Sequence, residues 1–306
     1  LKGNVGLGVG SGLAAEKEAV EKVKLTVLAD DYAGYGSRLW AQHGVSYLIE
    51  VERKGGKETI LFDTGTSADP ILYNMKTLGI NPSIIDLIVL SHNHYDHTGG
   101  LLKLLQAIGR GNIPIIAHPE IFKTSIILRP KLEVVGLKGN TREEAEKLGG
   151  QWVLSREPVK LTEAVYTTGE IERSVDFERE APLKVYTVEN GQLKVDLFLD
   201  DLSLFICLKK GILVVSGCAH AGIINILKQS LRLSKASGIR AVIGGFHLVG
   251  ASKKRIEKTV EAFRKLKVEE VYSGHCTGFQ AEKIFAERLG ERFHRLYCGL
   301  TLNFEG

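Results

Sequence analysis

Short apolar runs rich in β-branched residues alternate along the chain with segments of helical periodicity. Such runs predict β-strands, whereas apolar residues spaced three or four positions apart predict amphipathic helices. The predicted strands are 24–29, 45–52, 59–63, 84–91, 113–117, 183–189, 193–199, 202–208, 212–217, 241–245, 268–274 and 293–297. The predicted helices are 13–23, 68–78, one after Gly100, 221–236, 252–266 and 278–289. The run at 84–91 is apolar almost throughout, which favours a strand buried on both faces.

Each half of the chain begins with strands and continues with alternating strands and helices. This order predicts an α/β (α+β) fold in which two mixed sheets pack face to face with helices outside, a four-layer αββα sandwich. We expect residues 1–23 to form an N-terminal tail with a short helix, and residues 24–306 to form one domain. The segment at about 119–182 is rich in proline and charge, which predicts an insertion that covers the functional site.

The composition is that of a globular protein, since 44% of the 306 residues are hydrophobic and 25% are charged. The net charge of +4 comes from 40 basic and 36 acidic residues, which is too balanced for non-specific nucleic-acid binding. Apolar runs stay shorter than the roughly 18 residues of a membrane-spanning helix, so we expect no membrane partner. The four cysteines form no C-x-x-C pair and predict a reducing compartment, the cytoplasm.

The stretch that follows the apolar run 84–91 places four potential metal ligands within six residues. They are His92, His94, Asp96 and His97. Imidazole and carboxylate groups bind Zn²⁺, Mn²⁺ and iron, and a catalytic site holds them on a rigid frame with one coordination position open. A loop between a buried strand and a helix provides that frame. The stretch therefore predicts a metal site, with a polar active-site loop or a run of surface histidines as the alternatives.

The H-x-H-x-D-H pattern, followed by TGG at 98–100 and preceded by FDTG at 62–65, resembles the metallo-β-lactamase superfamily. Further motifs resemble one branch of it, the 7,8-dihydropterin-6-methyl-4-(β-D-ribofuranosyl)-aminobenzene-5′-phosphate synthases of methanopterin biosynthesis. In chain order these motifs are QHGVS at 42–46, TGEIER at 168–173, DDLSL at 200–204, SGCAHAGIIN at 216–225, GGFHL at 244–248 and SGHCTG at 273–278. Gln42 departs from the Glu that we expect in this branch.

The resemblance implies one or two divalent transition-metal ions, Zn²⁺ first, with Mn²⁺ or Fe²⁺ as alternatives. It assigns His92, His94 and His220 to one ion, and Asp96, His97 and His275 to a second. Candidates for a residue that bridges the two ions are Cys218, Asp200 and Asp201. A centre with no bridging side chain, or with a single ion, is the alternative, and Cys218 could equally be a small buried residue.

Three residues are predicted to act in catalysis. Asp96 would orient the attacking group in a hydrolytic reaction as well as bind metal. His247, in the GGFHL motif, ends a predicted strand on the same side as His220 and His275, so we expect it to contact the substrate or an ion. Arg173, in TGEIER, is predicted to bind phosphate as a forked donor, and an exposed arginine paired with a neighbouring glutamate is the alternative.

The resemblance implies an enzyme that joins a dihydropterin methyl diphosphate to ribofuranosyl-aminobenzene 5′-phosphate with release of pyrophosphate. The expected partner is therefore an anionic phosphorylated small molecule, and a homo-oligomer is left open. The alternative is a hydrolase of phosphodiesters or related esters that uses a metal-bound hydroxide. Asn93 stands where di-iron redox proteins of this fold carry an acidic residue, which disfavours redox chemistry.

Overall fold

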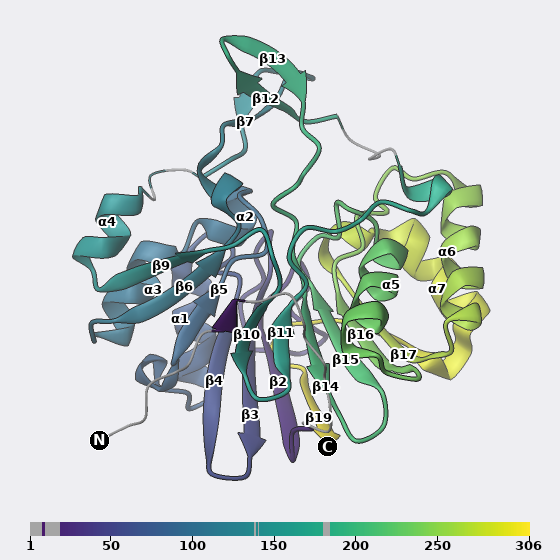
Figure 1. The fold of residues 1–306 in the computed structure, drawn as a ribbon, viewed down its shortest axis with the longest axis horizontal. Coiled ribbons are helices and arrows are strands. Elements are labelled where there is room, and N and C mark those ends of the chain that lie inside the picture. The colour runs from purple at the N-terminus through teal and green to yellow at the C-terminus, as the bar shows by residue number, and fades with distance from the viewer. Residues whose placement is uncertain (1–7, 10–18, 138, 140, 180–183) are drawn as a thin grey trace.

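The molecule consists of two large β-sheets, a third, small sheet, and the helices that pack on them. The structure is a computed structural model that describes residues 8–9, 19–137, 139, 141–179 and 184–306. The two large sheets pack against each other and carry helices on their outer faces, and the small sheet stands at the top of the view in Figure 1. This arrangement confirms the predicted four-layer αββα sandwich of two mixed sheets.

The first large sheet has seven strands in the order β19, β2, β3, β4, β5, β6 and β9. Their bounds are β2 Lys22–Ala29, β3 Ser46–Arg53, β4 Gly56–Phe62, β5 Leu87–Val89, β6 Ile113–Ala117, β9 Gly150–Leu154 and β19 Thr301–Glu305. Strands β19 to β4 pair antiparallel, and strands β4 to β9 pair parallel. The carboxyl ends of β4, β5 and β6 therefore meet at one edge, where ligand-binding loops of such sheets usually lie.

The second large sheet has eight strands in the order β1, β10, β11, β14, β15, β16, β17 and β18. Their bounds are β1 Gly8–Val9, β10 Val159–Thr162, β11 Val165–Thr167, β14 Leu204–Cys207, β15 Ile212–Ser216, β16 Ile239–Gly244, β17 Val268–Ser273 and β18 Phe293–Arg295. Strands β15 to β18 are parallel, so the loops after β15, β16 and β17 also meet at one edge.

The helices cover the outer faces of the two large sheets. Their bounds are α1 Ala68–Thr77, α2 Tyr95–Thr98, α3 Leu101–Ile108, α4 Arg142–Lys147, α5 Ile223–Ser234, α6 Lys253–Lys265 and α7 Phe279–Leu289. Short 3₁₀ turns are η1 Pro82–Ile84, η2 Pro119–Phe122, η3 Asp176–Glu178, η4 His275–Thr277 and η5 Gly290–Arg292. Helices α1, α3 and α4 pack on the first sheet, and α5, α6 and α7 pack on the second. None of the described helices is long and apolar enough to cross a membrane.

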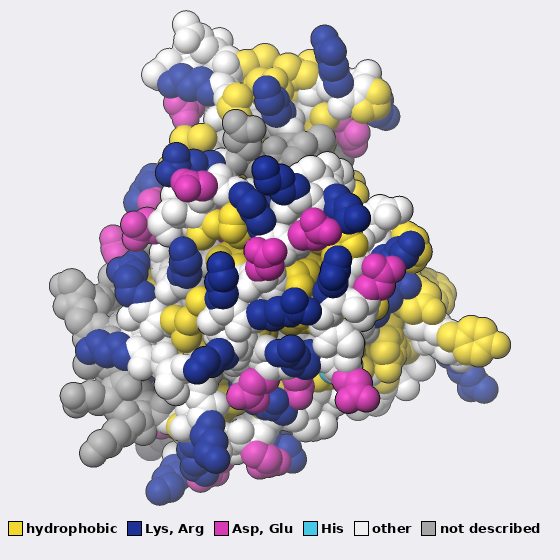
Figure 2. Space-filling model, turned by 90° about the vertical axis from the view of Figure 1, so that its right-hand side faces the viewer, with side chains coloured by type: hydrophobic (Ala, Val, Ile, Leu, Met, Phe, Trp, Pro, Cys, Tyr) yellow, Lys and Arg dark blue, Asp and Glu magenta, His cyan; other side chains and the backbone are white. Residues whose placement is uncertain are grey.

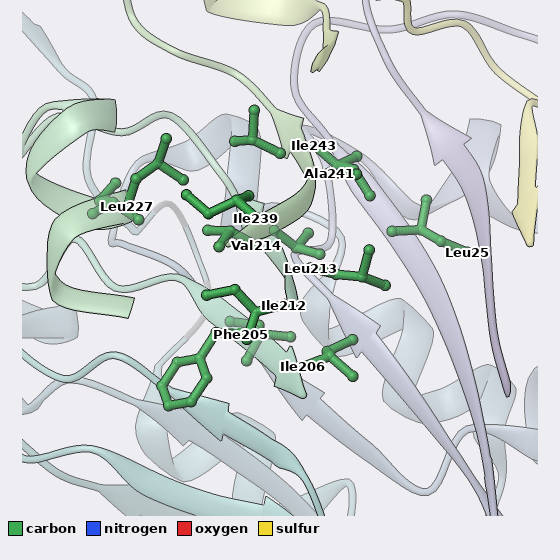
Figure 3. Packing of buried hydrophobic residues seen from close by; sticks show 14 of the residues in the cluster. Leu25, Phe205, Ile206, Ile212, Leu213, Val214, Leu227, Ile239, Ala241 and Ile243 are labelled. Atoms are coloured by element: carbon green, nitrogen blue, oxygen red, sulfur yellow. The ribbon is translucent and has the colours of Figure 1, made fainter. Parts of the chain in front are cut away.

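The alternation of side chains along the strands builds one core between the sheets and others beneath the helices. In β3, Tyr47 and Ile49 belong to the core between the sheets, whereas Leu48 belongs to the core under α1 and α3. In β15, Leu213 points toward Leu25 of β2, and the next residue, Val214, points toward α5 (Figure 3). Buried apolar residues on both faces explain why these strands read as nearly continuous hydrophobic runs.

The small sheet has the strand order β13 (Gln192–Val195), β12 (Tyr186–Glu189), β7 (Ser125–Ile127) and β8 (Glu133–Val134). Its inner face is continued by Val135 and Val185, which pack with Phe198. Its outer face carries apolar residues that remain exposed; they are Val134, Val188, Leu193 and Val195. The small sheet thus covers the region near Phe198 with one face and presents the other to solvent.

The segment 119–182, which we predicted as an insertion, is only partly outside the large sheets. It supplies β9 to the first sheet and β10 and β11 to the second, and only β7 and β8 join the small sheet. The proline and charge content that suggested an insertion comes from the short connections and turns, such as those at Pro119 and Pro158, and from the charged helix α4. The extent of the insertion therefore needs this correction.

Most predicted helices and strands are confirmed to within a few residues. The predicted helix 13–23 falls largely on residues 10–18, outside the described residues, and its last two positions belong to β2 instead. The predicted strand 193–199 ends at Val195, because Asp196 turns back to accept a hydrogen bond from the amide of Phe198. The start of the predicted strand 183–189 is also wrong, since β12 begins at Tyr186.

Figure 2 shows the face that carries the outer helices of the second sheet. Lysine and arginine side chains there alternate with aspartate and glutamate, and histidine is scarcely visible. Pairs such as Arg288 with Glu257 belong to this mixed surface. Most of the histidines are instead buried inside the molecule, where they form the cluster described next.

Candidate metal centre

The H-x-H-x-D-H loop begins where the buried strand β5 ends. Strands β4 and β6 pair with β5 on either side, so the start of the loop is fixed by two parallel neighbours. The loop continues through α2 into α3, and His92, Asn93 and His97 are fully buried. Its backbone is also held from outside the loop, since the amide of Asn93 donates to Asp200 Oδ2 at 2.9 Å. The loop is therefore a rigid frame of the kind predicted from the sequence.

Three histidines form the first group of potential ligands. They are His92, His94 and His220, whose nearest ring nitrogens all lie within 4.8 Å of one another. The ring centroids of His92 and His220 are 4.7 Å apart, and those of His94 and His220 are 4.9 Å apart. His220 comes from the loop after β15, so the two large sheets contribute to one cluster.

A second group lies directly beside the first. It consists of Asp96, His97, Cys218 and His275, whose ligand atoms also lie within 4.8 Å of one another. His275 Nε2 is 3.2 Å from Asp96 Oδ2, and His97 Nε2 is 3.0 Å from Cys218 Sγ. The ring centroids of His92 and His97 are 4.2 Å apart, so the two groups form one continuous centre.

The donor set fits divalent cations. Among the described residues, Nε2 of His92, His94, His220 and His275 is buried without a hydrogen-bond partner. Burial holds the pKa of His92 and His220 well below the ordinary value and lowers that of His94 to about 4. These rings are therefore neutral, and each can donate a nitrogen lone pair to a cation. Burial would raise the pKa of Asp96, but the neighbouring imidazoles outweigh it and hold that pKa well below its ordinary value.

Carboxylates outside the two groups orient the histidines. Asp63, at the end of β4, accepts hydrogen bonds from the amide and hydroxyl of Ser91, both at 2.7 Å, and pairs with His97 Nδ1 at 2.6 Å. Asp31 pairs with His275 Nδ1 at 2.8 Å. Each of these bonds leaves Nε2 facing the centre, which is the usual arrangement around a metal-ligating histidine.

The three candidates for a bridging residue lie in different surroundings. Cys218 belongs to the second group and also lies within 4.8 Å of the ring nitrogens of His220 and His247, so its sulfur is central. Asp200 accepts hydrogen bonds from Lys123 Nζ, at 2.6 Å, and from the amide of Asn93. Asp201 accepts a hydrogen bond from the amide of Ala221 at 2.7 Å. Of the three, Cys218 is the one that the structure brings into the ligand groups.

His247 and Arg173 take different positions. The His247 ring lies 4.2 Å from that of His220, and neither of its nitrogens has a hydrogen-bond partner among the described residues. Arg173 is half-buried and donates to the carbonyls of His220 at 3.2 Å and Leu197 at 2.6 Å. Its guanidinium thus fixes the main chain beside the centre, a role that the sequence did not suggest.

Two residues near the centre were not predicted from the sequence. They are Asp31 and Phe198. Asp31 follows a predicted strand, and Phe198 lies just before the DDLSL motif, so position along the chain gave a weak signal for both. The ion pairs of Lys123 with Asp196 and Asp200 gave none, because these carboxylates lie more than 70 positions away in the sequence.

A family model described as the metallo-β-lactamase superfamily matches residues 39–275. A 7,8-dihydropterin-6-methyl-4-(β-D-ribofuranosyl)-aminobenzene-5′-phosphate synthase of Methanocaldococcus jannaschii is 48% identical over 93% of this chain and 98% of its own. An uncharacterized protein of the same organism is 32% identical over 84% of this chain and 91% of its own. A solved metal-dependent hydrolase of the β-lactamase superfamily is 30% identical, with a TM-score of 0.75, over 93% of this chain and all of its own. The chain belongs to the metallo-β-lactamase superfamily, as its ligand motif predicted.

Proposed function

We propose that this protein is a metal-dependent synthase that joins a dihydropterin methyl diphosphate to ribofuranosyl-aminobenzene 5′-phosphate. The observation that carries the proposal is the 48% identity, over nearly the whole of both chains, to the M. jannaschii protein named as that synthase. In the reaction, the arylamine nitrogen forms a bond to the pterin methyl carbon. The carbon–oxygen bond to the diphosphate breaks, and the amine loses one proton.

The proposed ligands of the first ion are His92, His94 and His220, and those of the second are Asp96, His97 and His275. Zn²⁺ is the proposed metal, because neutral imidazoles dominate the donor set and a thiol lies among them. A divalent ion held there would neutralise the negative charge that develops on the diphosphate leaving group.

The chain's own residues prepare the site for two anionic substrates. His247 would contact a substrate or an ion, since its free ring nitrogens lie at the edge of the first group. Arg173 would hold a phosphate through the N–H groups that its two carbonyl contacts leave unused. Asp96, ionised and buried between the imidazoles, would orient the attacking group in the hydrolytic alternative.

A direct assay tests the proposal. The protein is stripped with a chelator, reloaded separately with Zn²⁺, Mn²⁺ or Fe²⁺, and incubated with both substrates. We expect pyrophosphate release in a one-to-one ratio with the coupled product, identified by mass, and no release when the arylamine is omitted. Pyrophosphate release without the amine, or no release with any metal, would contradict a synthase.

Substitution of the ligands gives a second test. His94→Ala or Asp96→Ala should lower the metal content measured by elemental analysis and abolish turnover, while the circular dichroism spectrum remains that of the wild type. The matched control is His294→Ala, because His294 is exposed and stacks on Tyr272 in β18 and β17. Full activity of a ligand variant in chelator-treated buffer would rule out the metal mechanism.

Hydrolysis of a phosphodiester or related ester is the second candidate. It is favoured by the 30% identity, over 93% of this chain, to a solved metal-dependent hydrolase. The two candidates share a ligand set, so the substrate decides between them. Cleavage of bis-(p-nitrophenyl) phosphate by the reloaded protein, without coupling activity, would favour the hydrolase.

The compartment and the partners follow from the same reasoning. We propose the cytoplasm, because all four cysteines are free thiols, as a reducing compartment would leave them. The proposed partner is an anionic phosphorylated small molecule. A homo-oligomer stays open, and light scattering of the purified protein would measure it.

A further inference from the structure

His220 differs from other proposed ligands in how its ring is held. His97 and His275 each have a hydrogen bond at Nδ1, to Asp63 at 2.6 Å and to Asp31 at 2.8 Å. Ligand histidines are commonly oriented by such a bond at the nitrogen that does not face the metal. Among the described residues, neither ring nitrogen of His220 has a hydrogen-bond partner. The orientation of its ring therefore needs another cause.

Phe198 supplies the missing contact. Its ring lies parallel to that of His220, with the centroids 4.1 Å apart and 3° between the planes. It meets the ring of His94 edge-on, with the centroids 5.6 Å apart and 86° between the planes. Stacked and edge-on aromatic pairs are both attractive arrangements. One side chain thus contacts two of the three imidazoles in the first group.

Phe198 is itself fixed from several sides. Its φ of +51° is rare for a bulky residue and persists only where the surroundings hold it. Its amide donates to Asp196 Oδ1 at 2.7 Å, and its carbonyl accepts from the amide of Asp201 at 3.2 Å. Lys123 Nζ lies 2.7 Å from Asp196 and 5.6 Å from the centroid of the Phe198 ring. These contacts hold the Phe198 ring in place beside the ring of His220.

We propose that Phe198 is a positioning residue that sets the ring plane of His220 and thereby the geometry of the first metal site. The inference rests on the proposed metal function. Stacking fixes the plane of the imidazole without occupying either nitrogen, so His220 can turn one nitrogen to an ion. A side chain at position 198 without a flat ring would leave His220 free to rotate.

Binding of Co²⁺ to the metal-free protein, followed by visible absorption and by calorimetry, tests the proposal without an activity assay. Phe198→Leu removes the flat ring. Phe198→Asn also removes it but tolerates the positive φ, so it separates the ring from the backbone conformation. We expect both variants to lower the affinity of one of the two sites about tenfold or more, with a changed absorption spectrum. Phe198→Tyr keeps the ring and should bind Co²⁺ within about threefold of the wild type.

Phe205→Leu is the matched control, because Phe205 is equally buried and its ring stacks on Tyr166 within the second sheet, outside the ligand groups. It should bind Co²⁺ like the wild type, and thermal unfolding of each metal-free variant reports its folding separately. Wild-type affinity in both Phe198→Leu and Phe198→Asn would overturn this proposal alone. A wild-type protein that binds no Co²⁺ would overturn the metal function and this proposal together.

Discussion

Asp63 connects the first sheet to the ligand loop more tightly than any other carboxylate that the structure describes near the centre. It is fully buried, follows β4 directly with a φ of +59°, and holds both Ser91 and His97. A carboxylate can accept all three of these hydrogen bonds, whereas an amide presents one accepting oxygen and an NH₂ group that faces other donors. The two carboxylate oxygens of Asp63 are thus what keep the Nε2 of His97 directed to the centre.

Asp63→Asn should therefore weaken metal binding at the second site by roughly 10–100-fold. It should also lower the free energy of unfolding by about 2 kcal/mol, because buried donors lose their charged acceptor. Asn tolerates the positive φ, so the backbone is not the cause. Calorimetric metal titration and denaturant unfolding measure the two effects. Asp86→Asn, at a partly exposed carboxylate that accepts from the amide of Thr59, is the control and should leave metal binding unchanged.

Cys218 makes a separate prediction at the same scale. Burial raises the pKa of its thiol well above the ordinary value, so an ion must displace the proton to bind the sulfur. We expect the Co²⁺-loaded wild type to show sulfur-to-cobalt charge-transfer absorption, and Cys218→Ser to lose it. Cys298→Ser should keep the absorption, because Cys298 is buried against the carbonyls of Asp30 and Trp40. A wild-type spectrum without this band would remove Cys218 from the ligand set.

At the scale of elements, the two faces of the small sheet lie in different surroundings. Val185 and Val135 on the inner face pack with Phe198, whereas Val188 on the outer face is 46% exposed. The inner face is thus part of the structure that keeps the Phe198 ring in place. The apolar residues of the outer face remain between 44% and 51% exposed.

Val185→Ala should lower the free energy of unfolding by about 2 kcal/mol, since it removes two buried methyl groups and leaves a cavity. Val188→Ala, on the exposed outer face of the small sheet, should change the free energy of unfolding by less than about 0.5 kcal/mol. Denaturant unfolding of the two variants measures the difference. An equal loss of unfolding free energy in the two variants would show that the outer face is also buried, against a partner other than the described residues.

The element scale also shows what the sequence could predict. Periodicity located β6 without error and α1, α5, α6 and α7 to within two residues, because their apolar patterns are local. The H-x-H-x-D-H loop could also be predicted, since its potential ligands are neighbours in the chain. The alternating run 193–199 is not a strand throughout, because Asp196 accepts a hydrogen bond from the amide of Phe198 and also pairs with Lys123, a tertiary contact that no local pattern encodes. Phe198 and Asp31 were missed for the same reason.

At the scale of the whole molecule, the centre joins the two halves of the sandwich. His92, His94, Asp96 and His97 come from the first sheet, and His220 and His275 come from the second. Ions bound there would hold together loops that are far apart in the sequence. An unfolded chain cannot present the same set of ligands, so binding favours the folded state.

Removal of the ions should therefore lower the melting temperature without unfolding the protein at room temperature. A free ion at a thousandfold excess over its dissociation constant stabilises the fold by about 4 kcal/mol. Calorimetric scans with and without a chelator, and after Zn²⁺ is restored, measure the shift. Ca²⁺, which prefers oxygen ligands, should not restore the melting temperature. Identical scans in all four conditions would contradict a centre shared by the two halves.

The last strand, β19, has a consequence for how the protein is made. It pairs with β2 along five residues and completes the first sheet, although the elements just before it belong to the second. During synthesis, β2 leaves the ribosome long before β19, and its outer edge stays unpaired until β19 follows. Open strand edges are where chains associate wrongly. The nascent protein thus carries an aggregation hazard from the synthesis of β2 until that of β19, and a chaperone that shields β2 would relieve it.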